Sequence, residues 1–125
     1  MYIPDHFAIK SADVMHKIIQ AHPLGVLVTM TPEGLDANHI PFELHAERGV
    51  LTAHVARANP MLADLAVSPQ TLLVFQGAEH YITPSWYATK KETEKVVPTW
   101  NYAVVHVKGQ MQVVDDAAWL HQQLE

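Results

Sequence analysis

The feature that most constrains the fold is a series of short apolar runs, each about as long as a β-strand and each bounded by a turn signal. The clearest turn is Thr31-Pro32-Glu33-Gly34, where proline takes its usual second position. Apolar and polar residues alternate with a period of two, which predicts strands that pair as antiparallel hairpins. We expect strands over 25–30, 35–42, 50–56, 71–76, 79–83, 100–107 and 110–114.

Helix signals are fewer and short. A first helix is predicted over 12–22, with Ser11 as its N-cap and Pro23 ending it. A second is predicted to open at Asn59 and Pro60, which suit the N-cap and the first helical position. A last helix follows Asp115 or Asp116. Many short strands with brief helices between them indicate a mainly β fold, a small antiparallel barrel or sandwich.

Length and composition favour one globular domain over residues 1–125. Apolar residues make up 49% of the chain and charged residues 17%. No apolar run approaches the roughly 18 residues that a membrane helix needs, and the N-terminus lacks a signal-peptide pattern. Without cysteine nothing argues for export, so we expect a cytoplasmic protein. The sequence stops at 122–125 in mid-helix, which suggests a C-terminally short chain.

The charge balance disfavours direct DNA binding. The net charge is −5, whereas a protein that holds DNA through its phosphates needs a basic face. The nearest candidate is the segment 90–95, in which two glutamates lie among three lysines.

Aromatic residues cluster between 81 and 108. Trp86 and Tyr87 precede the polar segment 90–95, and Trp100 and Tyr102 follow it. Flat side chains on both sides of a polar loop suit the wall of a site for a planar ligand, or an interface. The alternative is that the two tryptophans close the core at the strand ends.

A second candidate site lies where a predicted strand runs into a helix N-terminus. Free backbone N–H groups there favour an anion, and Arg57 adds a planar cation just upstream of Asn59. This is a reasonable phosphate seat. Alternatively, Arg57 pairs with Asp64 on the next turn and Asn59 only caps the helix.

Other chemistry finds little support. There are nine histidines, and His39, His45 and His54 could converge, but no spacing typical of a metal site is present. We therefore predict no metal and no catalytic residue. His54 and His106 are placed on strands, beside a ligand or as satisfied core residues. No G-x-S-x-G motif is present, which disfavours a hydrolase.

Four longer motifs carry a resemblance to a known family. They are MYIPDHF (1–7), HVARANP (54–60), HYITPSWY (80–87) and VPTWNYAVVHVKG (97–109). With these motifs the chain resembles the PaiB-type FMN-binding negative transcriptional regulators. The resemblance implies a six-stranded FMN-binding split barrel that forms a homodimer, with flavin at the subunit interface.

The resemblance also implies site residues. The phosphate would lie at Arg57, Ala58 and Asn59, beside His54, and backbone groups of a neighbouring strand would line the isoalloxazine. The candidate flavin-binding residues are Asn38, His39, Ile40, His54, Arg57, Ala58, Asn59, Trp86, Trp100 and Asn101. The last three are pocket-rim candidates that a partner subunit could contribute.

Three functions stay open at this point. The first is an FMN-binding regulatory protein that signals through flavin occupancy or redox state. The second is a flavin-dependent oxidoreductase that passes electrons from NAD(P)H to a small acceptor, so enzyme activity is left undecided. The third is a haem-binding split-barrel protein with His39 or His54 as ligand.

Overall fold

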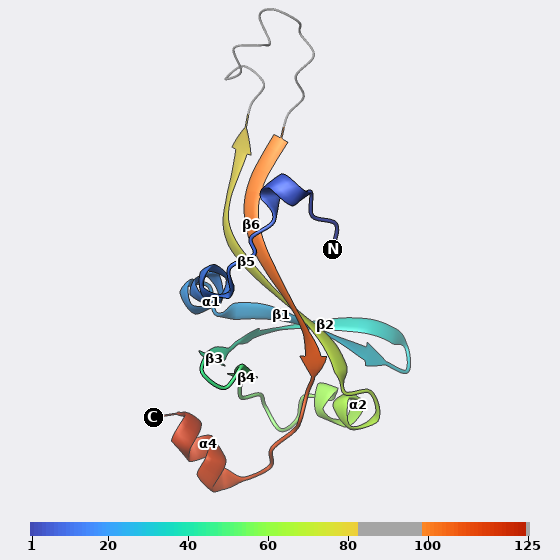
Figure 1. Ribbon diagram of the computed structural model, residues 1–125. Coiled ribbons are helices and arrows are strands. Elements are labelled where there is room, and N and C mark those ends of the chain that lie inside the picture. The colour runs from blue at the N-terminus through green and yellow to red at the C-terminus, as the bar shows by residue number, and fades with distance from the viewer. Residues whose placement is uncertain (83–98, 125) are drawn as a thin grey trace, which may run out of the picture.

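The computed structural model describes residues 1–82 and 99–124, which form two antiparallel sheets with short helices around them (Figure 1). The larger sheet has four strands in the order β2-β1-β5-β6, and β3 pairs with β4 in the smaller one. The strands are β1 (Leu24–Thr31), β2 (Gly34–Pro41), β3 (Glu43–His45), β4 (Val50–Thr52), β5 (Gln70–Ile82) and β6 (Thr99–Gln110). The helices are the 3₁₀ turn η1 (Asp5–Phe7), α1 (Ala12–Ala21), α2 (Met61–Val67) and α4 (Ala117–Gln123).

The mainly β fold with six antiparallel strands is confirmed, and it is consistent with a split barrel. The first hairpin is also as predicted. The hydroxyl of Thr31 accepts a hydrogen bond from the backbone of Glu33 and donates to the carbonyl of Gly34. Gly34 has φ +118°, a conformation that favours glycine. No described helix is long and apolar enough to cross a membrane.

Several strand boundaries differ from the prediction. The runs 71–76 and 79–83 belong to one strand, β5, whose register against β6 shifts at a bulge between Gln76 and Glu79. The predicted strand 50–56 ends at Thr52. Beyond it Ala53 and Val55 pack against the core, but their backbone does not pair with another strand. The run 110–114 is not a strand, because β6 ends at Gln110. Strand β3 was not predicted.

The core lies on one face of the four-stranded sheet. Both helices α1 and α2 place their buried residues there, together with the β3–β4 hairpin. At its centre the completely buried ring of Phe75 meets the ring of Phe42 edge to face, with centroids 5.9 Å apart. The buried apolar residues are Ile19, Leu27, Ile40, Phe42, Met61, Leu65, Leu73, Phe75 and Val105. Beside them, the buried hydroxyl of Thr29 has no hydrogen-bond partner among the described residues.

The other face of the sheet, here named the open face, is also apolar. Register places every second residue of each strand on it. Leu35 and Tyr102 are 72% and 65% exposed there, and the valines between them are half-buried. The apolar residues of the open face are Leu24, Val26, Val28, Met30, Leu35, Leu72, Val74, Tyr102 and Val104. Exposed apolar surface of this kind marks an interaction site.

Strands β5 and β6 continue beyond the rest of the sheet as a two-stranded arm (Figure 1). Strand β1 pairs with β5 only over Leu72–Val74, so the arm beyond Gln76 has no third strand among the described residues. Helix α1 packs against the start of this arm, where Ile18 of the helix and Ala103 of β6 both lie next to Gly77. A two-stranded ribbon is marginal alone, so further packing on the arm is expected.

Candidate functional site

The loop between β4 and α2 forms the centre of the candidate site. A turn closes where the backbone N–H of Asn59 donates to the carbonyl of Ala56, 2.9 Å away. The side-chain oxygen of Asn59 then accepts from the N–H of Met61 at 3.0 Å, which caps the start of α2. The helix begins at Met61 with Pro60 as its N-cap, so the predicted positions of Asn59 and Pro60 are wrong by one residue. The side chain of Asn59 nevertheless pairs with a free N–H group at the start of the helix, as predicted.

Asn59 also connects this loop to strand β2. Its Nδ2 donates to Oδ1 of Asn38 at 3.3 Å, and both side chains are half-buried. Asn38 lies opposite Leu27 on the core face of the sheet. Two residues that are 21 positions apart, and that the sequence assigned to one flavin site, are thus in contact.

Arg57 lies at the surface, two residues before Asn59. Its Nη1 donates to Oδ2 of Asp115 at 2.9 Å, with 82% and 70% of the two side chains exposed. This hydrogen bond, with the charge attraction beside it, raises the pKa of Arg57 and lowers the pKa of Asp115. The alternative considered from the sequence, that Arg57 pairs with Asp64, is wrong. The partner comes instead from the segment after β6, 58 positions along the chain.

The remaining candidates near this loop differ in exposure. His54 is exposed and follows the end of β4, so its predicted place on a strand is wrong, and so is the alternative that it is a core histidine. Ala58 is exposed as well. His39 lies exposed on the open face, whereas the side chain of Ile40 is buried in the core. Ile40 can therefore contact a ligand only through its backbone.

The backbone of β2 is accessible in principle because β2 is an edge strand. Its neighbour in the sheet is β1, on one side. An edge strand presents N–H and C=O groups that its own sheet does not use. Backbone recognition of a planar ring by residues 38–40 fits this position.

Two of the three rim candidates lie on the arm. Trp86 falls outside the described residues, and Trp100 and Asn101 belong to β6, near the far end of the arm. In the sheet Asn38 shares a row with Leu27, Leu73 and Val107. Asn101 is six residues further along β6, about 20 Å at the usual rise of a strand. One chain therefore does not bring Asn101 to the loop that carries Arg57 and Asn59.

A shallow groove lies on the open face at the bulge of β5. Its volume is about 420 Å³, and the amide of Gln76 donates to the carboxylate of Glu79 beside it. The groove is lined by Gln76, Glu79, Tyr102, Val104 and His106. Sequence patterns did not indicate it, because the bulge that joins these residues is a property of strand pairing.

His106 in this groove predicts a pH dependence of stability. Burial lowers its pKa first, and the positive charges of the amino terminus and Lys108 lower it further. The unfolded chain, with a histidine pKa of about 6.5, then binds more protons, so stability rises with pH up to about that value. We expect the midpoint of urea unfolding to decrease when the pH is lowered from about 7 to about 5. In His106→Gln this decrease should be smaller. His22→Gln, at an exposed histidine, should retain all of it; equal falls in both variants would contradict the assignment.

Metal ligation finds no geometric support in residues 1–82 and 99–124, where no three His, Asp or Glu side chains gather around a common point. The triad His39, His45 and His54 considered from the sequence does not converge. His45 instead contacts Thr52 within the β3–β4 hairpin.

Comparison with known proteins identifies the family. The family described as "Putative FMN-binding domain" matches residues 1–125. This chain belongs to that family. The FMN cofactor and the PaiB-type resemblance that the motifs indicated are thereby confirmed.

Three relatives illustrate the extent of the match. The Saccharomyces cerevisiae protein YKL070W is 36% identical, over 96% of this chain and 83% of its own length. The Bacillus subtilis protein "Protease synthase and sporulation protein PAI 2" is 32% identical, over 92% of this chain and 54% of its own. An Emericella nidulans protein, AN0679, is 32% identical, over 94% of this chain and 58% of its own. The chain thus spans little more than half the length of two of these relatives.

Proposed function

We propose that this FMN-binding protein acts as a homodimer in a regulatory role, with the flavin phosphate at Arg57 and Asn59. The isoalloxazine lies along the edge of β2 at residues 38–40, and the arm of a partner subunit completes the pocket. The observation that carries this proposal is the contact between Asn59 and Asn38, which joins the loop bearing Arg57 to the edge strand.

The residues at this place fit a phosphate ester. Arg57 presents a guanidinium with most of its side chain exposed, and a guanidinium binds phosphate oxygens through two parallel hydrogen bonds. The amide of Asn59 is held in place by Met61 and Asn38, so it adds an oriented polar group close by. Ala58 and His54 lie exposed on the same loop, where they leave room for a ligand.

The open face supports a homodimer. It carries nine apolar side chains, while α1, α2 and the β3–β4 hairpin pack on the opposite face. A second copy would cover this face with an identical patch, as isologous dimers do. Within one chain Asn101 lies about 20 Å along β6 from the row of Asn38, so the proposed pocket takes its rim residues from the arm of the partner subunit.

In the proposed regulatory role, the signal is the occupancy or the redox state of the bound flavin. Bound FMN supplies redox chemistry, while the residues described here bind and orient it. The name of the Bacillus subtilis relative refers to protease synthesis and sporulation, which supports a regulatory output for this type of protein. Oxidation of NAD(P)H that depends on added FMN would favour the oxidoreductase alternative instead.

The phosphate seat is tested by Arg57→Ala. We expect the FMN dissociation constant to rise roughly ten- to a hundredfold, the loss for a charge-assisted hydrogen bond, as measured by flavin fluorescence. Binding of riboflavin, which lacks the phosphate, should change little. The control is Arg48→Ala, the other arginine of the chain, which lies in the β3–β4 turn beside Glu47. Unchanged FMN affinity in Arg57→Ala would remove Arg57 from the site.

A further inference from the structure

The cation that the proposed site requires is already engaged by a carboxylate of the same chain. Arg57 Nη1 and Asp115 Oδ2 are 2.9 Å apart, and both side chains are mostly exposed. Asp115 stays ionised in this contact, since its pKa is lowered by Arg57. A flavin phosphate bound at Arg57 would therefore compete with the carboxylate of Asp115 for the same guanidinium.

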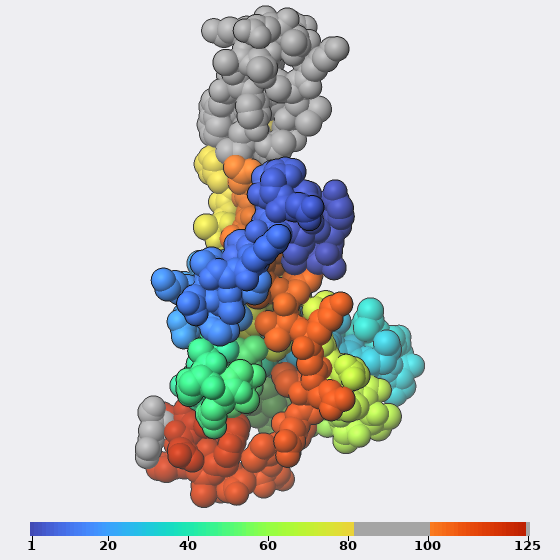
Figure 2. Space-filling model, viewed as in Figure 1, coloured from blue at the N-terminus to red at the C-terminus, as the bar shows by residue number. Residues whose placement is uncertain are grey.

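Asp115 belongs to the segment 111–124, which follows β6 and ends in α4. Figure 2 shows this segment, in orange to red, running across one end of the molecule to the green β3–β4 hairpin. At its start the N–H of Met111 donates to the carbonyl of Pro69 at 2.9 Å. Asp116 caps α4 by accepting from the N–H groups of Ala118 and Trp119.

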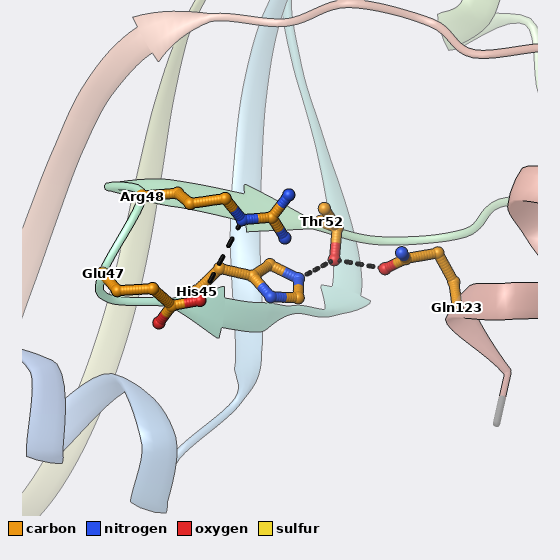
Figure 3. A network of polar contacts seen from close by, with 5 residues as sticks. All are labelled: His45, Glu47, Arg48, Thr52 and Gln123. Carbon is orange, nitrogen blue, oxygen red and sulfur yellow. Dashed lines mark hydrogen bonds and ion pairs between the residues drawn. The ribbon is translucent and has the colours of Figure 1, made fainter.

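The far end of the segment is held by a chain of hydrogen bonds (Figure 3). The hydroxyl of Thr52 donates to Oε1 of Gln123 at 2.8 Å, and Nε2 of His45 lies 3.0 Å from the same hydroxyl. The hydroxyl of Thr52 therefore joins the side chains of His45 and Gln123. The segment is thus attached at both ends to the body, and the ion pair holds its middle.

The middle contact is the one that an anion can replace. An exposed ion pair contributes little, because water screens it and two long side chains must be ordered. A phosphate monoester carries a charge of about −1.5 to −2 at neutral pH and binds a guanidinium through two oxygens. With phosphate bound, the adjacent carboxylates of Asp115 and Asp116 would repel it.

We propose that Asp115 competes with the FMN phosphate for Arg57, so that it sets the affinity for FMN and couples flavin binding to release of the middle of segment 111–124. This inference rests on the proposed function, since it assumes that the phosphate binds Arg57. It adds a ligand-discriminating residue that the flavin-site candidates did not include. Asp115 would discriminate between phosphorylated and unphosphorylated flavin, because riboflavin has no phosphate to bind Arg57.

The first test is Asp115→Asn, which removes the charge and keeps the size of an exposed side chain. FMN should bind about two- to fivefold tighter, the range that loss of an exposed ion pair permits, and riboflavin affinity should not change. The matched control is Asp116→Asn. It removes the same charge one residue away, keeps an oxygen that can cap α4, and should alter FMN affinity much less.

The second readout is hydrogen exchange in peptides that cover 111–124. In the natural protein FMN should accelerate exchange around Asp115 while riboflavin does not, and in Asp115→Asn exchange should be fast before any flavin is added. If Arg57→Ala weakens FMN binding but Asp115→Asn leaves it unchanged or weaker, the inference is overturned and the phosphate seat stands. If neither substitution alters FMN affinity, both the seat and the competition are wrong.

Discussion

In the proposed homodimer, replacing Val74 with lysine is expected to separate the two subunits. Val74 lies half-buried on the open face, between Val26 of β1 and His106 of β6. In the isolated chain a lysine there can extend its ammonium group into water. In a dimer formed through the open face, each of the two subunits would bury one lysine charge, at a cost of several kcal/mol for each ion. We therefore expect the dissociation constant of the dimer to increase by about a hundredfold or more.

Sedimentation velocity over a range of concentrations measures this effect directly, and FMN titration on the same samples tests whether the site needs the partner. The matched control is Val67→Lys at the end of α2, where the side chain is 84% exposed and away from the open face. A Val74→Lys protein that dimerises as tightly as the natural chain would show that the interface lies elsewhere. A natural chain that stays monomeric would contradict the dimer itself.

Phe75→Ala is expected to cause the largest loss of folding stability. Phe75 is fully buried at the centre of the core, where its ring meets Phe42 and closely approaches the backbone of Gly25. Removing a buried ring costs its transfer free energy plus the cavity that remains, about 3–5 kcal/mol. Because small domains are stable by only about 5–15 kcal/mol, this change should lower the urea midpoint severely or unfold the chain.

The exposed Phe7 offers the same chemical change outside the core. Its side chain is 70% exposed, so Phe7→Ala should alter the free energy of unfolding by no more than about 0.5 kcal/mol. Phe75→Leu should lie between the two, because leucine refills part of the cavity. Equal losses for Phe7→Ala and Phe75→Ala would mean that the sheet face assigned to the core is wrong.

Features that depend on neighbouring residues were predicted well. Ser11 accepts a hydrogen bond from the N–H of Val14 at the start of α1, and Asn59 does so for Met61 before α2. The turn at 31–34 and the positive φ of Gly49 in the turn at 46–49 follow equally from local chemistry. Each of these contacts spans two or three residues, so one short stretch of sequence contains both partners.

Features that depend on strand pairing were not predicted correctly. The sequence showed two strands on either side of Gly77, yet β6 pairs with both and makes them one strand with a bulge. Residues 50–56 and 110–114 alternate as strands do, but strand state requires a partner backbone over the whole run. Only Val50–Thr52 and the residues up to Gln110 have one. Conversely, β3 forms because β4 is there to pair with it.

The candidate site divides in the same way. Arg57 and Asn59 were recognised because a cation, a capping residue and a helix start occur within a few positions. Their partners Asn38 and Asp115 lie 21 and 58 positions away, and no local pattern selects them. The sequence offered Asp64 as the partner of Arg57 because it was near along the chain, whereas the course of the segment after β6 brings Asp115 to it.

The sequence by itself determined the mainly β character, the local turns and caps, and, through its four motifs, the FMN-binding family. The tertiary structure decided which face of the sheet is covered and which is left open. It also decided which carboxylate holds Arg57, and that Asn101 on the arm lies far from the Arg57 loop of its own chain. Strands β1 and β5 contain continuous apolar runs, such as Val26-Leu27-Val28, which make both faces of the sheet apolar. Only the packing of α1, α2 and the β3–β4 hairpin on one face therefore distinguishes the core from the open face.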